Sequence, residues 1–173
     1  LEKRLEENET SSPAATLETQ AARIEEFRGN FKEAAKAHTE ASRKFRLART
    51  DVGQKNAAAS LTMAGQALDQ SGDPTGAIDR FEGAIKLWER LLETAPDVPD
   101  YLEGLATAHI SLANVQRDVG VSAEDTYRDA ATAFDSLIKA RPEIPRYQFN
   151  RATAMVNLAW LLNQSAPGRN CLL

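Results

Sequence analysis

The side chains of this sequence that could act in acid–base, nucleophilic or metal chemistry are two histidines, His38 and His109, and one cysteine, Cys171. A catalytic or metal site needs further histidine, cysteine or carboxylate partners at matched spacing, and none accompanies these three residues. Both histidines fall on inward faces of predicted helices, where a packed and hydrogen-bonded imidazole is the expected state. Cys171 falls in a predicted tail. We therefore predict no catalytic residue, no metal site and no cofactor, and we expect that the chain is not an enzyme.

Motifs of other chemistries are also missing. The sequence contains no glycine-rich phosphate loop, no Gly-x-Ser-x-Gly and no His-Glu-x-x-His. Its net charge of −4, from 21 basic and 25 acidic residues, gives no general reason to expect a nucleic acid partner. No apolar run approaches the roughly 20 residues needed to cross a bilayer, so we expect no membrane insertion. A single cysteine leaves the compartment undetermined, with the cytoplasm slightly favoured.

One basic cluster stands out. Arg43, Lys44, Arg46 and Arg49 follow Lys32 and Lys36 in the same predicted helix. These cations could contact phosphate or an acidic partner. Basic residues near the end of a helix also complement its dipole, so an ordinary solvated face is the simpler interpretation.

The segment between Gly72 and Pro96 is the clearest structural element. Gly72 can take the left-handed conformation that ends a helix, Asp73 can cap the next helix, and Pro74 suits its first turn. The apolar residues that follow recur at steps of three and four: Ala77, Ile78, Phe81, Ala84, Ile85, Trp88, Leu91 and Leu92. This spacing predicts an amphipathic helix of about five turns.

Six further helices are predicted from similar stripes and from helix-ending residues. They run from Pro13 to Gly29, from Phe31 to Ala48, from Asp51 to Ser71, from Tyr101 to Gly120, from Ser122 to Arg141, and from Pro145 to about Gln164. Asn30, with Glu33 three positions later, is expected to form a capping box, and Ser122 is expected to cap the sixth helix.

The helices repeat in pairs. Pro96, Pro99 and Tyr101 recur 46 positions later as Pro142, Pro145 and Tyr147. An offset of 43 relates Gly29, Ala34, Ala41 and Phe45 to Gly72, Ala77, Ala84 and Trp88. A period of this length, in a chain without β-type alternation, indicates a stacked array of helix pairs.

The residues of the central unit resemble a tetratricopeptide repeat, with Leu61, Ala64, Gly65 and Leu68 in its first helix and Gly72, Ala77, Phe81 and Ala84 in its second. The resemblance implies an all-α, right-handed superhelical array of antiparallel helix pairs, with three pairs plus a terminal helix. It divides the chain into a linker or frayed helix at 1–12, the repeat domain at 13–165 and a flexible tail at 166–173. The units are longer than the usual 34 residues and look like arrays attached to bacterial multidomain proteins such as serine/threonine kinases.

Close helix contacts are expected where the paired helices carry small residues. We predict that Gly65 lies against Ala84 within the central pair. The aromatic side chains of Phe81 and Tyr127 are expected to fill the wedge between one pair and the next.

The resemblance also implies a working surface, the concave groove lined by the first helix of each pair. Its predicted partner-binding residues are Thr62, Gln66, Asp69, Ile110, Asn114, Arg117, Val156, Trp160 and Asn163. The two-lysine clamp that some members of this family use for a terminal carboxylate is not matched, because its positions are taken by Thr19, Arg23, Thr62 and Thr107.

The function implied is a non-catalytic scaffold that binds a peptide or protein partner in this groove. Two alternatives remain open, a structural module that self-assembles and a regulatory segment of a larger enzyme such as a kinase. Trp160 and Leu162 make the last helix more apolar than its repeat counterpart, so a homo-oligomer through this helix is one expected outcome.

Overall fold

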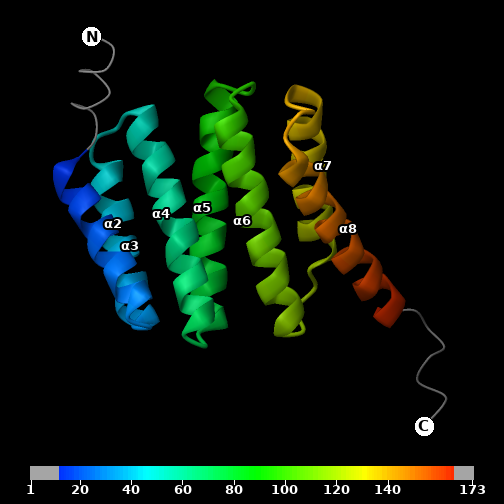
Figure 1. Cartoon of the computed structure of the whole chain (residues 1–173), viewed down its shortest axis with the longest axis horizontal. Helices are drawn as coiled ribbons and strands as arrows, with labels where there is room; N and C mark the ends of the chain where they lie inside the picture. The colour runs from blue at the N-terminus through cyan, green and yellow to red at the C-terminus, as the bar shows by residue number, and fades with distance from the viewer. Residues whose placement is uncertain (1–11, 166–173) are drawn as a thin grey trace.

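The computed structural model describes residues 12–165, and every regular element in this range is a helix. The seven described helices are α2 (Pro13–Phe27), α3 (Phe31–Arg46), α4 (Asp51–Gln70), α5 (Pro74–Thr94), α6 (Pro99–Asp118), α7 (Glu124–Ala140) and α8 (Pro145–Ser165). They stand side by side in chain order, with short connections between antiparallel neighbours (Figure 1). The predicted all-α array is confirmed. The predicted tail and all of the predicted linker except Ser12 lie outside the described residues.

Each helix packs against the next one along the chain. Following the repeat unit of the sequence, we describe the helices as the pairs α2–α3, α4–α5 and α6–α7, followed by α8. In addition, α4 contacts α6 directly. The first helices of the pairs therefore form one face of the array, which we call the first-helix face. The opposite side, formed by α3, α5 and α7, is the second-helix face.

Glycines in the left-handed conformation end three of the helices. Gly29, Gly72 and Gly120 have φ angles of 78°, 79° and 73°. After Gly72 the backbone N–H of Asp73 donates to the carbonyl of Leu68 at 2.9 Å, which closes the last turn of α4. These three endings agree with the glycine positions in the sequence.

The start of α5 also follows the sequence prediction. The carboxylate of Asp73 accepts a hydrogen bond from the backbone N–H of Gly76 at 3.0 Å, and Pro74 is the first residue of the helix. The cap satisfies a backbone donor that has no partner within the helix.

Asn30 is the N-cap residue of α3, as predicted, but the predicted capping box is wrong, because the Asn30 side chain makes no cap hydrogen bond and its amide donates to the carboxylate of Glu25 at 2.7 Å. The predicted cap of the sixth helix is also wrong. The N-cap of α7 is Ala123 rather than Ser122. Ala123 is fully buried in a cluster with Tyr127, so packing of this turn sets where the helix begins.

Small residues allow the helices to approach, but their neighbours differ from the prediction. The closest neighbour of Gly65 is the ring of Phe81, which would lie 2.7 Å from an added Cβ, rather than Ala84. Phe81 therefore fills the space within the α4–α5 pair. Between pairs the space is filled by Trp88 of α5, whose indole lies against Gly104 of α6.

Candidate functional site

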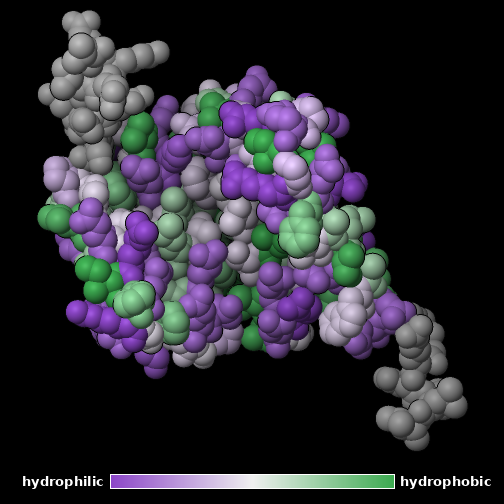
Figure 2. All heavy atoms as spheres, in the orientation of Figure 1, coloured by the Kyte–Doolittle hydropathy of each residue, from purple (hydrophilic) through white to green (hydrophobic). Residues whose placement is uncertain are grey.

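The first-helix face is hollowed between α4 and α6, as the space-filling view shows near its centre (Figure 2). This α4–α6 cavity has a volume of about 450 Å³. It is lined by Lys55, Ala59, Thr62, Met63, Gln66, Trp88, Asp100, Glu103, Gly104, Thr107 and Arg146. The lining residues come from α4, α5, α6 and the start of α8, so no single helix creates the cavity.

A second cavity adjoins the first on the same face, between α2 and α4. It has a volume of about 300 Å³ and is lined by Thr16, Thr19, Gln20, Arg23, Phe45, Asn56, Ala59, Ser60 and Met63. Ala59 and Met63 line both cavities. The two cavities therefore adjoin on one face, over α2, α4 and α6, and we call them together the groove.

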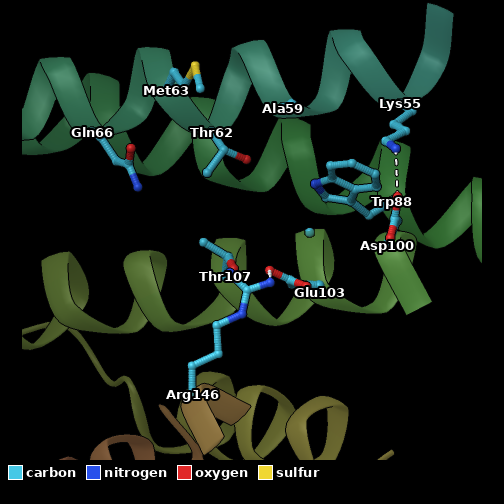
Figure 3. A pocket seen from close by; sticks show the side chains of 11 residues that line it. Lys55, Ala59, Thr62, Met63, Gln66, Trp88, Asp100, Glu103, Thr107 and Arg146 are labelled. Atoms are coloured by element: carbon cyan, nitrogen blue, oxygen red, sulfur yellow. Dashed lines mark hydrogen bonds and ion pairs between the residues drawn. The ribbon is translucent and has the colours of Figure 1, made fainter. Parts of the chain in front are cut away.

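Two ion pairs lie at the α4–α6 cavity, one between α4 and α6 and the other between α6 and α8 (Figure 3). Lys55 of α4 contacts Asp100 of α6 at 2.8 Å, and this hydrogen bond and charge lower the pKa of the Asp100 carboxyl. Arg146 of α8 contacts Glu103 of α6 at 2.5 Å. Because each cation faces a carboxylate, the positive and negative charges of the side chains that line this cavity cancel.

Glu103 is held from a second side. The Tyr147 hydroxyl donates to its other carboxylate oxygen at 2.7 Å, and the Arg146 guanidinium lies 5.4 Å from the centre of the Tyr147 ring. Burial, followed by the hydrogen bond to Glu103, raises the pKa of the Tyr147 hydroxyl. These contacts fix α8 against α6 at the edge of the groove.

Trp88 and Gly104 form the apolar floor of the α4–α6 cavity. Only 3% of Trp88 is exposed, and its indole nitrogen has no hydrogen-bond partner in the described part of the chain. An added Cβ at Gly104 would lie 2.4 Å from two carbons of the indole. The ring therefore occupies the space that a side chain at position 104 would take.

Of the predicted partner-binding residues on α4, Thr62 and Gln66 line this cavity, whereas Asp69 is exposed beyond it. Figure 3 shows Thr62 and Gln66 pointing toward α6. Thr62 is only 8% exposed, and its hydroxyl donates to the carbonyl of Ala58 at 3.1 Å. Gln66 is thus the more accessible polar group.

The predicted residues on α6 are engaged within the array. The Asn114 side-chain oxygen accepts hydrogen bonds from the hydroxyl of Tyr127 at 2.7 Å and from the amide of Asn157 at 3.2 Å. Ile110 is half-buried against the cluster that contains Tyr127. Arg117 is paired with Asp118 at 2.7 Å. A partner could reach these groups only by competing with internal contacts.

The predicted residues on α8, which are Val156, Trp160 and Asn163, are all exposed. None of them lines either groove cavity. They belong to a separate apolar surface of α8, on which Trp160 is 52% exposed. The assignment of all nine residues to partner binding stays a prediction.

Sequence reasoning missed several groove residues, among them Lys55, Met63, Glu103 and Arg146. Lys55, Ala59 and Met63 recur every four positions on α4, so their common face could have been read from the spacing. By contrast, no local pattern pairs Lys55 with Asp100, because 45 positions separate them. The comparison with the carboxylate clamp did locate the groove. The four residues at the clamp positions, which are Thr19, Arg23, Thr62 and Thr107, all line one of its two cavities.

The described residues contain no cluster of three or more histidine, cysteine or carboxylate side chains that could hold a metal ion. His38 is fully buried, and its Nε2 lies 3.0 Å from the carboxylate of Glu26. Burial lowers the pKa of His38, and Glu26 opposes this shift. His38 is therefore the packed, hydrogen-bonded histidine expected from the sequence. No described helix is long and apolar enough to span a membrane.

The comparisons with known proteins agree with this architecture. A family model described as tetratricopeptide repeat matches residues 62–119 and 121–157, which together are more than half of the chain. The match begins within α4 and ends within α8, so it covers the second half of α4 and all of α5, α6 and α7. No curated protein matches the sequence.

Proposed function

The chain belongs to the tetratricopeptide repeat family, and we propose that it is a non-catalytic scaffold that binds a peptide or protein segment in the groove of its first-helix face. Repeats of this family are generally protein–protein interaction modules, and their all-helical fold is typically non-catalytic. The observation that carries the proposal is that two adjoining cavities lie on one face, over α2, α4 and α6.

The size of the groove suits an extended peptide. Neighbouring packed helices lie about 8–10 Å apart, so a groove across three helices is about 20 Å long. An extended chain spans about 3.3 Å per residue, which corresponds to a peptide of about six residues. Side chains of such a peptide can contact Met63, while Ala59 leaves room for the peptide backbone.

Polar groups of the groove match a peptide backbone. The side-chain amides of Gln20, Asn56 and Gln66 make no hydrogen bond to other described residues, and each offers both donors and an acceptor. Lys55 and Arg146, in contrast, already face carboxylates. Arg23 also lines the groove and pairs with no described carboxylate, but a single exposed cation holds a terminal carboxylate only weakly, so we propose an internal peptide segment as the occupant.

A paired substitution tests this proposal. Met63 in the groove is 40% exposed, and Val119, which follows α6 and lines neither cavity, is 43% exposed, so Met63→Glu and Val119→Glu each place a carboxylate at similar exposure. Linear peptides selected from a random display library on the unmodified chain are measured against both variants by fluorescence anisotropy. Met63→Glu is expected to weaken binding at least tenfold, because it places a charge on the apolar contact surface. Selected peptides that bind both variants equally would refute the groove as the site.

We propose self-association through α8 as a second function. Its exposed apolar side chains are Phe149, Met155, Val156, Trp160 and Leu162. Phe149, Val156 and Trp160 recur at steps of seven and four, so they share one side of the helix, and an exposed apolar stripe of this kind favours an interface. Trp160→Glu is expected to reduce association in sedimentation experiments, whereas Phe27→Glu, at a 95% exposed position on α2, is expected to leave it unchanged. A monomeric unmodified chain at high concentration would exclude this function.

The resemblance to arrays attached to bacterial kinases supports a further use of the same groove, in a regulatory segment of a larger enzyme. The coding sequence on either side of this chain tests that idea directly. A neighbouring catalytic domain would support it, and a stand-alone repeat protein would contradict it.

A further inference from the structure

The second-helix face carries its own pair of adjoining cavities, between α3 and α5. The larger has a volume of about 740 Å³ and is lined by Thr39, Glu40, Ser42, Arg43, Arg46, Leu47, Arg49, Gln54, Leu61, Asp79, Arg80 and Gly83. The other has a volume of about 450 Å³ and is lined by Lys32, Ala35, Lys36, Thr39, Glu40, Leu68, Asp73 and Arg80. The cavities share Thr39, Glu40 and Arg80, and we call them together the basic groove. It shares no lining residue with the groove of the first-helix face.

The basic groove is positively charged although the chain has a net charge of −4. Its cations are Lys32, Lys36, Arg43, Arg46, Arg49 and Arg80, and its carboxylates are Glu40, Asp73 and Asp79. Arg43 is paired with Glu40 at 2.7 Å, and Lys36 is paired with Glu33 outside the groove at 2.8 Å. The other four cations form no ion pair with any described carboxylate.

Arg80 lies where the two cavities meet, and one of its polar atoms lacks a partner. Its Nε is buried and makes no hydrogen bond to the described residues. The Arg80 side chain as a whole is half-buried, and its guanidinium pairs with no described carboxylate, so its positive charge is available to an acidic ligand where the two cavities meet.

The helix dipole does not account for this distribution of charge. Cations are favourable at the end of a helix, which is consistent with Arg43 and Arg46 near the end of α3. Lys32, however, lies in the first turn of α3, where a cation is unfavourable, and Lys36 lies in the second turn, away from both ends of the helix. Arg80 lies in the second turn of α5. A helix end therefore does not explain why these cations lie together. Their common feature is the groove that they line.

We propose that the basic groove binds an acidic peptide segment of a partner protein. From Lys32 to Arg46 the helix rises about 21 Å, which an extended peptide covers with about six residues. Leu47, Leu61 and Leu68 also line the groove, so an apolar side chain of the peptide fits between its carboxylates.

The lining favours a peptide over a nucleic acid. Proteins that bind single-stranded nucleic acid generally stack bases on aromatic side chains, and no aromatic residue lines either cavity. The carboxylates of Glu40, Asp73 and Asp79 would also repel a continuous phosphate backbone, whereas a peptide can place its acidic side chains selectively.

Binding of three fluorescein-labelled probes to the full chain tests the proposal. One probe is a seven-residue peptide with a central leucine flanked by glutamates, the second has glutamine in place of each glutamate, and the third is a single-stranded oligonucleotide. The test variant is Lys32→Gln with Arg46→Gln, which removes one exposed cation at each end of the basic groove. The control variant is Arg90→Gln with Lys139→Gln, which makes the same change in net charge at exposed positions outside the groove. Circular dichroism verifies that both variants are folded.

We expect the glutamate peptide to bind the unmodified chain and the control variant equally. Binding to the test variant is expected to be roughly tenfold weaker, as for the loss of two exposed ion pairs. The proposal is overturned if the test and control variants bind this peptide equally, or if the glutamine peptide binds as tightly. A tighter, groove-dependent interaction with the oligonucleotide would also overturn it, because the occupant would then be a nucleic acid.

Discussion

Replacing Gly104 with alanine tests how closely α5 and α6 are packed beneath the groove. The new Cβ would lie 2.4 Å from two carbons of the Trp88 indole, whereas carbon atoms pack at about 3.5–4.0 Å. The ring or the helix must therefore shift by more than 1 Å. Trp88 is only 3% exposed, so the ring has little free space into which it can move.

The expected free-energy change combines two opposing effects. Overpacking a buried site costs about 1–3 kcal/mol. Alanine is also a better helix former than glycine by about 1 kcal/mol, which offsets part of that cost. We expect Gly104→Ala to lower the free energy of unfolding by roughly 1 kcal/mol, which corresponds to a fall in melting temperature of about 2–4 °C.

Gly83→Ala is the matched control. Gly83 also lies inside a helix, α5, but an added Cβ would approach only the flexible end of Leu61, at 3.3 Å. This variant should be stabilised by nearly the full helix-propensity gain of about 1 kcal/mol. Denaturant unfolding followed by circular dichroism compares the two variants with the unmodified chain. If Gly104→Ala is as stable as Gly83→Ala, the close contact between α5 and α6 is wrong.

Three further predictions concern the stability of the array. Burial lowers the pKa of both His38 and His109 from the ordinary value of 6.5, so the unfolded chain takes up protons first as the pH falls. Stability should therefore be greatest above pH 6.5 and should decline below it, and His38→Gln should reduce that decline in thermal melts across pH 5–8. The helix pair within 14–48 should open first, because α2 buries only two alanines, and hydrogen exchange that is slowest in this pair would contradict the prediction. Asp73→Ala removes the cap of α5 and should cost about 1 kcal/mol, measured by denaturant unfolding, whereas an unchanged midpoint would show that the cap is dispensable.

The amino-acid sequence alone determined the helices, their grouping and the family. Apolar spacing of three and four residues, the glycines that end helices and the recurrence of proline and tyrosine are local or periodic signals. They depend on backbone geometry and on the burial of one helix face, which every unit of the array repeats. For this reason the prediction of three helix pairs and a terminal helix could be made without knowledge of any contact.

The tertiary structure decided which side chains meet. The family resemblance assigned Asn114 to the groove, but hydrogen bonds to Tyr127 and Asn157 engage it within the array. The groove itself brings together Lys55 and Asp100, which belong to different repeats. Helix periodicity determines the direction of a side chain only around its own helix axis. The distance between two helices depends on the volumes of the side chains between them, as the contact of Trp88 with Gly104 demonstrates. These volumes influence the structure only when the helices are packed against each other.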